Sequence, residues 1–348
     1  MATIAEVASE ARVGVATVSR VLNGSPAVRD ETRRRVLDAI ARLGYAPNAT
    51  ARALSTGRTR AIGVLAPFFT RPSVIERLRG VSRVLARAGY QLVLFDSERL
   101  HALPDGGLDG LLTLSLCPSE SDLERFAAGG APVVLVDHPH DRLPAVFTDD
   151  VAGGRLATEH LLALGHERIA FIGDGDAGAG ALRRTGYERA LADAGIEPDP
   201  ALVRTGACGR EAAAALARAL LHAPDPPTAL FATSDTQALG VLEAAAGLGA
   251  CVPGDLAVIG YDDIELARYA GLTTVAQPLE ESGARGAQLL LAALEGAPAA
   301  GRQLTVELVV RETTGPPSTK RGRSPRNRKA AGRDRLRQGR RDGIRVRS

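Results

Sequence analysis

The sequence predicts an N-terminal three-helix head followed by a larger α/β body with two lobes. Three helical patterns with one apolar face each fall within residues 1–47, whereas residues 61–317 alternate short apolar runs with longer helical stretches. Charge divides the chain at similar places: residues 1–60 carry a net charge of +5, residues 61–317 carry −13 and residues 318–348 carry +11. A basic head on an acidic body indicates an anionic partner at one end and a different task at the other.

The head begins with a capping box. Thr3 and Glu6 have the spacing at which each side chain accepts the other residue's backbone N–H, so a helix starts there. A second helix is predicted over Val15–Leu22, and its buried residues are expected to be Val18, Val21 and Leu22. A third helix is predicted over Asp30–Leu43 with Gly44 as its C-terminal cap. Its inward residues are expected to be Val36, Leu37, Ile40 and Leu43.

The second predicted helix has the side chains of a DNA-reading helix. Such a helix presents short side chains and a long donor to the major groove. Here they are Val15, Ala16, Thr17, Ser19 and Arg20. Arg20 can hold a guanine edge bidentately, and the small apolar side chains can contact a thymine methyl. The alternative is a plain helical bundle whose arginines form a solvated face, because helical hairpins are common.

The apolar runs of the body are typical of parallel strands covered on both faces. They are AIGVLA (61–66), QLVLF (91–95), DGLLTL (109–114), PVVLVD (132–137), RIAFIG (168–173), TALFAT (228–233) and LAVIGY (256–261). Helical stretches separate them, among them Ser73–Ala88, Gly153–Leu164, Arg184–Ala194 and Thr236–Leu248. This rhythm predicts a doubly wound α/β fold, whose ligands bind beyond the carboxyl ends of the strands.

Several protein classes are disfavoured by composition and motif. Cys117, Cys208 and Cys251 are too scattered for a disulfide framework or a metal site, which indicates a reducing cytoplasm. No stretch is apolar enough to span a membrane, and no secretory leader is evident. The nucleophile elbow, the phosphate loop and the zinc-protease helix motif are all missing, so we expect no catalytic residues and no cofactor.

Two loops imitate functional motifs. Gly173–Gly178 follows a strand run and reads GDGDAG, which satisfies the dinucleotide-binding pattern. Its two aspartates would repel a pyrophosphate, and no acidic residue lies where a ribose needs one. A nucleotide-dependent enzyme therefore stays an alternative, not the main prediction. The segment Asp137–Asp141 reads DHPHD, which could bind a metal but is more typical of a solvated turn, so no metal is predicted.

The segments ATVSRVLN (16–23), TRRRVLDAIARLGYAPN (32–48) and ARALSTGRT (51–59) closely resemble the N-terminus of the LacI/GalR family of bacterial repressors. The resemblance implies a helix-turn-helix domain over residues 1–47 and a hinge helix with linker over 48–60. It also implies that Leu54 wedges into the minor groove and kinks the operator. The implied DNA-contacting residues are Thr3, Val15, Ala16, Thr17, Ser19, Arg20, Asn23, Asn48, Ala51 and Leu54.

The body resembles the effector domain of the same family, which is similar to periplasmic sugar-binding proteins. The resemblance lies in residues 149–174, 226–263 and 272–291. It implies an effector domain over 61–314, with chain crossings near Asp150, Gln277 and Val309. The implied N-lobe is 61–149 with 278–308, and the implied C-lobe is 150–277 with 309–314.

The resemblance also implies a set of effector-binding residues between the lobes. They are Phe68, Phe69, Asp149, Arg183, Asp235 and Asp262. Carboxylates and a guanidinium suit the hydroxyls of a sugar, and an aromatic face suits its ring. The alternative is that Asp235 caps the following helix and Asp262 caps a turn. Residues 66–72 depart from the family pattern, so the effector's identity stays open.

Three residues of the head also depart from the family pattern. Arg12 and Gly14 stand where the family usually has Gly and Ser, and Arg29 replaces the usual Ser before the third helix. Because glycine is a tolerable N-cap, we expect the loss of the hydroxyl at Gly14 to cost only a few tenths of a kcal/mol.

The C-terminal residues 315–348 combine dense positive charge with few apolar residues, which predicts a disordered tail. The tail either adds salt-sensitive phosphate contacts or is an extension without a function. Taken together, the residues and the resemblance predict a cytoplasmic, homodimeric transcriptional repressor that binds operator DNA and a sugar effector. A solute-binding protein of transport is a further alternative, which the helical head disfavours.

Overall fold

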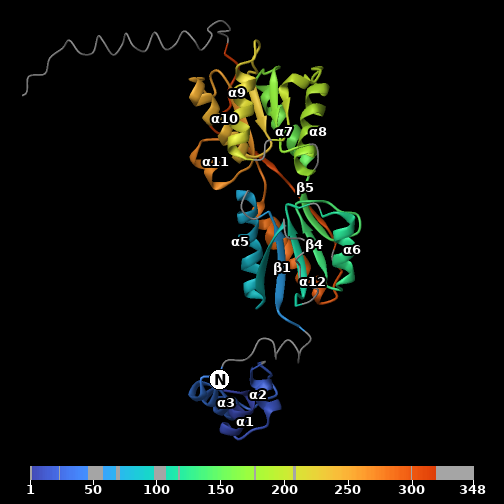
Figure 1. Ribbon diagram of the computed structural model, residues 1–348, viewed down its shortest axis with the longest axis vertical. Helices are drawn as coiled ribbons and strands as arrows, with labels where there is room; N and C mark the ends of the chain where they lie inside the picture. The colour runs from blue at the N-terminus through green and yellow to red at the C-terminus, as the bar shows by residue number, and fades with distance from the viewer. Residues whose placement is uncertain are drawn as a thin grey trace, which may run out of the picture. The chain divides into compact units, whose positions relative to one another are not determined.

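A computed structural model describes residues 2–22, 24–45, 58–67, 71–97, 107–116, 118–175, 178–206, 209–298 and 300–318. The chain divides into two compact units, the first formed by residues 1–61 with 107–109 and the second by the remainder (Figure 1). Within the described residues, no helix is long and apolar enough to cross a membrane.

The described part of the first unit contains three helices, and all three were predicted. They are α1 (Ile4–Glu10), α2 (Val15–Leu22) and α3 (Asp30–Leu43). The capping box is present: Thr3 Oγ1 accepts from the Glu6 N–H at 3.3 Å, and Glu6 Oε2 accepts from the Thr3 N–H at 2.8 Å. Gly44 ends α3 in the left-handed conformation with φ 57°, as predicted.

The core of the head differs in part from the prediction. Its buried residues are Val7, Ala8, Ala11, Val18, Val21, Val28, Val36 and Ala39. Leu37 and Leu43 were expected to face inward, but their exposed fractions are 49% and 37%. Leu37 follows Val36 directly and therefore lies about 100° around the helix from the buried face. Leu43 is the last residue of α3 and is not part of the buried cluster of the head.

The tight turn between α1 and α2 depends on Arg12 and Gly14. Arg12 has a φ of 54°, in the left-handed region that costs a side-chain-bearing residue about 1 kcal/mol. The Gly14 carbonyl accepts from the N–H groups of Thr17 and Val18 at 2.8 Å and 3.2 Å and so begins α2. The arginine in this left-handed position thus costs more than the few tenths of a kcal/mol expected for the missing hydroxyl at Gly14.

Within its described residues, the second unit contains two six-stranded sheets, one in each lobe. In the N-lobe the strand order is β11-β5-β4-β3-β1-β2, and the pairings with a defined register are parallel. The strands are β1 (Ala61–Ala66), β2 (Gln91–Asp96), β3 (Gly110–Leu114), β4 (Val133–Val136), β5 (Ala145–Thr148) and β11 (Arg302–Leu304). The helices are α5 (Pro72–Arg87), α6 (Glu120–Ala128) and α12 (Leu279–Leu294). Side chains of α5 and α12 pack together on one face of this sheet.

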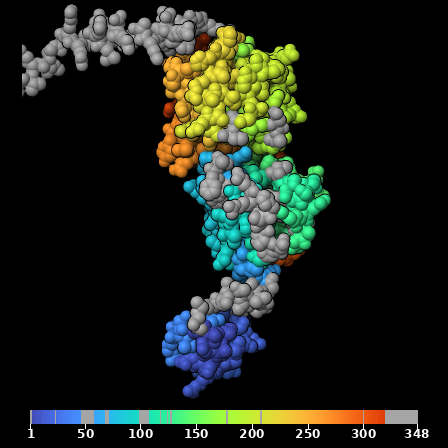
Figure 2. Space-filling view, in the orientation of Figure 1, coloured from blue at the N-terminus to red at the C-terminus, as the bar shows by residue number. Residues whose placement is uncertain are grey.

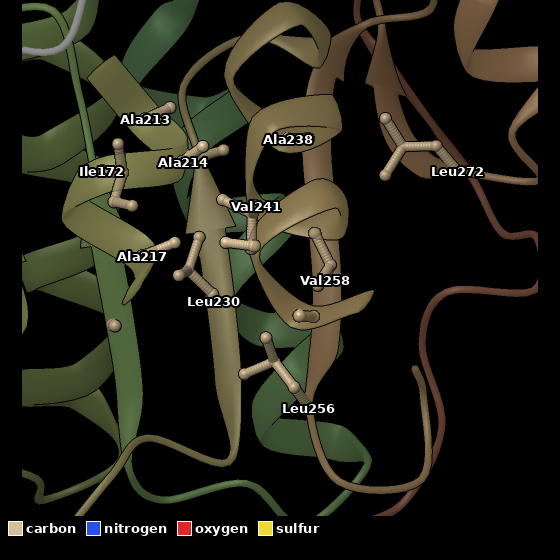
Figure 3. Packing of buried hydrophobic residues seen from close by; sticks show 14 of the residues in the cluster. Ile172, Ala213, Ala214, Ala217, Leu230, Ala238, Val241, Leu256, Val258 and Leu272 are labelled. Atoms are coloured by element: carbon tan, nitrogen blue, oxygen red, sulfur yellow. The ribbon is translucent and has the colours of Figure 1, made fainter. Parts of the chain in front are cut away.

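In the C-lobe the strand order is β12-β10-β9-β8-β6-β7, and only β12 runs antiparallel to its neighbour among the paired strands described. The strands are β6 (Ile169–Ile172), β7 (Val203–Arg204), β8 (Ala229–Ala232), β9 (Ala257–Asp262), β10 (Thr273–Ala276) and β12 (Glu307–Val309). The helices are α7 (Asp150–Ala163), α8 (Gly178–Asp193), α9 (Arg210–Leu221), α10 (Asp235–Leu248) and α11 (Glu265–Tyr269). Small side chains of α9 and α10 pack on one face, as Figure 3 shows, and α7 and α8 pack on the other.

The chain passes between the two sheets three times. The first passage follows β5 and the second follows β10, close to the predicted crossings at Asp150 and Gln277. The third lies between Leu304 of β11 and Glu307 of β12, which is earlier than the predicted crossing at Val309. β12 therefore belongs to the C-lobe sheet, whereas the prediction assigned residues 307 and 308 to the N-lobe.

Candidate functional site

The outer face of α2 has the character of a DNA-reading surface. Val15, Ala16 and Arg20 are exposed, and Thr17 and Ser19 are half-buried. The opposite face of the helix, with Val18 and Val21, is buried against the rest of the head. The helical period thus separates a packing face from a face of short side chains and one long donor, as the sequence predicted.

Of the remaining predicted DNA contacts, Thr3 lies within the described residues. Thr3 is exposed, and its hydroxyl accepts the capping hydrogen bond from Glu6. Asn23, Asn48, Ala51 and Leu54 lie outside the described residues.

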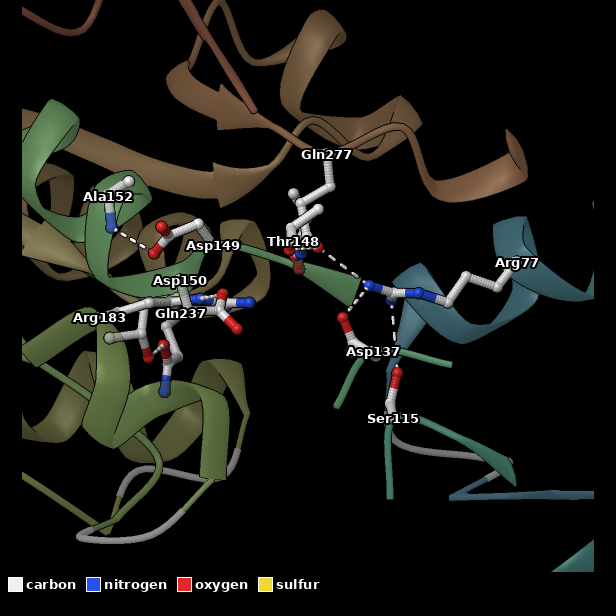
Figure 4. A network of polar contacts seen from close by, with 12 residues as sticks. Arg77, Ser115, Asp137, Thr148, Asp149, Asp150, Ala152, Arg183, Gln237 and Gln277 are labelled. Atoms are coloured by element: carbon white, nitrogen blue, oxygen red, sulfur yellow. Dashed lines mark hydrogen bonds and ion pairs between the residues drawn. The ribbon is translucent and has the colours of Figure 1, made fainter. Parts of the chain in front are cut away.

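Arg183 is the centre of a polar cluster at the carboxyl ends of the C-lobe strands (Figure 4). Its Nε donates to Asp150 Oδ1 at 2.8 Å, and its Nη1 donates to the backbone oxygen of Thr233 at 2.6 Å. The guanidinium carbon also lies 3.7 Å from the ring centroid of Tyr261, a cation–π geometry. Arg183 was predicted from the sequence, whereas Asp150 and Tyr261 were not.

A close approach of α7 and α8 places this arginine. A Cβ added to Gly154 would lie 2.1 Å from the backbone oxygen of Arg183, so only glycine lets the helices come this near. The approach brings the start of α7, where Asp150 lies, beside Arg183 of α8.

The two adjacent aspartates at the first crossing have different roles. Asp149 is exposed and caps α7, because its Oδ1 accepts from the Ala152 N–H at 2.9 Å. Asp150 is 3% exposed and pairs with Arg183. When two acids stand together at the start of a helix, the first can cap the helix and the second is free to pair with another side chain. The sequence therefore contained a signal for the role of Asp150.

Asp235 is a buried carboxylate that accepts hydrogen bonds from neighbouring segments of the C-lobe. It is fully buried, its Oδ1 accepts from the Thr274 hydroxyl at 2.6 Å, and its Oδ2 accepts from the Ile264 N–H at 2.9 Å. The cap of α10 is Ser234, whose hydroxyl accepts from the Gln237 N–H at 3.3 Å. The alternative capping role does not describe this carboxylate, which joins β10 to the segment after β9. Its contact with an effector stays a prediction.

Asp262 joins the C-lobe to the second crossing. Its Oδ1 accepts from Gln277 Nε2 at 2.6 Å, and Gln277 Oε1 accepts from the Thr148 hydroxyl at 3.1 Å. Asp262 ends β9 with a φ of 116°, which is strained for a residue with a side chain. Gln277 therefore contacts residues at the ends of β5 and β9, one strand from each lobe.

A second buried arginine completes the network from the N-lobe. Arg77 of α5 is 1% exposed and forms an ion pair with Asp137. It also donates to Ser115 Oγ at 3.3 Å and to Gln277 Oε1 at 3.0 Å. The signal in the sequence was an arginine three residues after Val74 and four before Val81, on the apolar face of a predicted helix. Its Nε has no partner within the described part of the chain.

Burial and the charges of neighbouring arginines together shift the pKa values of these acids in different directions. Burial raises the pKa of Asp262 to about 6, although the charges of Arg183 and Arg77 oppose this. Burial also raises the pKa of Asp150, against the opposing charge of Arg183. For Asp137 burial acts in the same sense, but the charges of Arg77 and Arg183 outweigh it and lower the pKa. Strained residues and shifted pKa values near the carboxyl ends of strands are typical of a functional site.

The remaining candidate residues are placed as follows. Phe68 and Phe69 lie outside the described residues. In the glycine-rich segment, Asp174 forms an ion pair with Arg71 at 3.2 Å and accepts a hydrogen bond from Gln237, so its carboxylate is engaged by other side chains of the protein. In the DHPHD segment, His140 Nδ1 accepts from the N–H groups of Arg142 and Leu143, both at 3.0 Å, as in a turn.

Comparisons with known proteins agree with both parts of the fold. Residues 3–48 match the family of bacterial regulatory proteins named lacI, and residues 158–314 match the periplasmic binding protein-like domain. The HTH-type transcriptional regulator CelR of Thermobifida fusca is 37% identical over 332 residues, which cover 89% of this chain and 98% of that protein. The ribose operon repressor of Haemophilus influenzae is 34% identical over 331 residues, covering 90% of this chain and 98% of that protein.

Solved structures of such regulators have the same fold. A complex of the transcriptional regulator CelR with cellobiose is 36% identical, covers 90% of this chain and 100% of that chain, and has a TM-score of 0.68. The lac repressor dimer bound to operator and the anti-inducer ONPF is 28% identical, covers 90% of this chain and 99% of that chain, and has a TM-score of 0.80. This chain belongs to the lacI family of bacterial regulatory proteins and is a DNA-binding transcriptional regulator.

Proposed function

We propose that this protein is a transcriptional repressor whose affinity for its operator is set by a sugar effector bound between the two lobes. The observation that carries the proposal is the hydrogen-bonded series from Arg77 through Gln277 to Asp262, which links charged residues of both lobes through a crossing. A ligand that engages this network changes the relation of the lobes, because it competes for the hydrogen bonds that join them.

The effector is held by Arg183 and Asp262 from the C-lobe and by Asp137 from the N-lobe. Asp262 is the last residue of β9, and Asp137 comes directly after β4. Arg183 lies on α8, a helix that packs on the C-lobe sheet. Doubly wound folds bind ligands at the carboxyl ends of their strands. Carboxylates and a guanidinium make paired hydrogen bonds to neighbouring hydroxyls. The relatives support a sugar, since one of them is a ribose operon repressor and another was solved with cellobiose. Phe68, Phe69 and Asp149 are further proposed contacts.

The operator is read by α2. Val15, Ala16, Thr17, Ser19 and Arg20 face the major groove, Thr3 and Asn23 contact the phosphates, and residues 48–55 form a hinge helix on the operator. Asn48, Ala51 and Leu54 then approach the minor groove, where Leu54 unstacks a base step. The protein acts in the cytoplasm as a homodimer on a pseudo-palindromic site, since a two-fold protein reads two half-sites. The domain boundaries proposed are residues 1–47, 48–60, 61–314 and 315–348, with the third crossing moved to 305–306.

The protein has no catalytic activity in this proposal, and its relatives are named as transcriptional regulators. Selecting bound fragments from random duplex DNA tests the reading role directly. The selected sequences share a pseudo-palindrome, and Arg20→Ala loses the preference at one or more base pairs of each half-site. Selected fragments without a common sequence contradict the proposal.

A further inference from the structure

A cavity lies in the C-lobe at the end opposite to Arg183 and Asp262. Its volume is about 620 Å³, which is in the range of ligand-binding cavities. It is lined by Ile169 and Thr228, which stand at the beginning of β6 and directly before β8. Thr233 and Asp262, in contrast, lie at the carboxyl ends of the strands. The cavity is therefore a separate feature that the proposed effector site does not use.

The cavity has an apolar floor and an acidic rim. The floor is formed by Ile169, Tyr187, Leu191, Ile196 and Leu202. The rim carries Glu167, Glu197 and Asp199, with one basic residue, Arg168. Arg168 is already neutralised, because it pairs with Asp199 at 3.3 Å and with Asp225 at 3.1 Å.

Glu167 and Glu197 make no ion pair with any basic side chain of the described residues, and both are exposed. The rim thus has an excess of negative charge beside apolar surface. An amphipathic cation suits such a site, because its apolar stem packs on the floor while its charge meets the carboxylates.

The C-terminal segment of the described chain ends at this cavity, since Pro317 and Ser318 are among its lining residues. The segment is anchored just before that point. His160 Nε2 and Thr314 Oγ1 are 2.9 Å apart, and His166 Nε2 and the Gly315 carbonyl oxygen are 2.8 Å apart. These contacts fix the place from which the rest of the chain continues.

The residues that follow are the most basic part of the sequence. Residues 318–348 carry a net charge of +11, and Lys320, Arg321 and Arg323 come first. Chain geometry holds the Cα of Lys320 within about 7 Å of Ser318 and that of Arg323 within about 18 Å. Such a short connection gives these side chains an effective concentration in the millimolar range at the rim.

We propose that this cavity and its acidic rim bind the first basic residues of the chain's own C-terminal tail, Lys320, Arg321 and Arg323. Glu167 and Glu197 receive the charges, and the apolar floor receives the stems. The bound segment holds these residues away from DNA phosphates, so the rim limits the non-specific affinity that the tail would otherwise add.

Zero-length carbodiimide cross-linking of the full chain tests this proposal. The sequence contains only two lysines, Lys320 and Lys329, so each lysine cross-link can be assigned without ambiguity by mass spectrometry. At low salt Lys320 cross-links to Glu167 or Glu197, and the yield falls at least tenfold in 1 M NaCl because the attraction is screened. Mixing isotope-labelled with unlabelled chains shows that the link lies within one chain.

A rim variant and a matched control sharpen the test. The double substitution Glu167→Gln with Glu197→Gln removes the cross-link and raises the affinity for non-specific duplex DNA about threefold at low salt. Glu295→Gln, which neutralises an exposed acid at the end of α12, changes neither. Cross-links from Lys320 spread over carboxylates away from the cavity, links between chains, or a rim variant that cross-links as the parent protein does would each overturn the proposal.

Discussion

Gln277 donates a hydrogen bond of 2.6 Å from Nε2 to Asp262 Oδ1, and so joins the second crossing to the end of β9. The other end of the same amide, Oε1, accepts from Arg77 at 3.0 Å and from Thr148 at 3.1 Å. One side chain thus contacts residues of both the N-lobe and the C-lobe. Loss of any of these bonds leaves a buried polar group without a partner, which costs free energy. This free-energy cost couples the positions of the two lobes.

Asp262→Asn changes the pH dependence of stability. Burial raises the pKa of Asp262 to about 6, above the unfolded value of about 4, so the folded state binds this proton more tightly. This acid therefore makes the parent protein less stable as the pH rises from about 4 to above 6. Asparagine has no such penalty, so the free energy of unfolding of the variant minus that of the parent grows by about 1 kcal/mol between pH 5 and pH 7.5.

Urea unfolding at the two pH values measures this difference. Asp141→Asn, at an exposed position in the DHPHD turn, serves as the matched Asp-to-Asn control. An equal difference between Asp262→Asn and the parent at both pH values contradicts the buried, ionisable state assigned to Asp262.

Arg77→Met leaves the Asp137 carboxylate buried without its cation. Breaking a buried ion pair by removing one partner costs about 3–5 kcal/mol in the free energy of unfolding. Adding Asp137→Asn removes the uncompensated charge and restores more than half of that loss. Thermal and urea unfolding of both variants check this prediction, and a double variant as unstable as the single one would show that the two residues do not act as a pair.

Arg29→Ser stabilises the head. Arg29 occupies the N-cap of α3 but makes no side-chain capping bond, and a serine there supplies an acceptor worth about 1 kcal/mol. Hydrogen exchange of the α3 amides in the full chain reports the change as about fivefold slower exchange. In the same helix, Arg34→Ser at an exposed interior position speeds exchange slightly, because serine is a poorer helix former than arginine. Equal effects at both positions would refute the capping explanation.

Leu54→Ala separates specific from non-specific DNA binding. The proposed wedge acts only on a kinked operator, so its removal weakens operator affinity by at least tenfold and leaves the affinity for random duplex DNA within twofold. Fluorescence anisotropy with the two DNAs at equal salt measures both. An equal loss on both DNAs would assign Leu54 to the fold of the hinge instead.

The sequence was sufficient for the parts of the fold that local patterns determine. The three helices of the head follow from a capping box, one turn and a terminal glycine, and the long apolar strands follow from their uninterrupted burial. The short strands β5, β7, β10, β11 and β12 and the helices α6, α9, α11 and α12 were not predicted as elements. Strands of two or three residues, such as β7, β11 and β12, have too little pattern to be separated from loops, and pairing with distant strands determines them.

The candidate site was predicted only in part, because contacts between distant parts of the chain form it. Arg183 and Asp262 were named, but Arg183 pairs with Asp150, 33 residues away, and Arg77 pairs with Asp137 and Gln277, 60 and 200 residues away. No spacing rule joins residues at such distances, because the folded sheets bring them together. Asp235 shows a different limit of sequence-based prediction. A carboxylate at the start of a helix can bind a ligand, cap the helix or support buried backbone, and only the surrounding residues in the fold determine which role it has.

The central claim is that effector and operator are coupled through the two lobes. The most direct test is to titrate labelled operator with the full protein, with and without saturating sugars that include cellobiose and ribose, and to measure the sugar's affinity with and without operator. At least one sugar changes operator affinity fivefold or more, and operator changes that sugar's affinity by the same factor, as linkage requires. Sugars that bind the protein yet leave operator affinity unchanged would contradict the account.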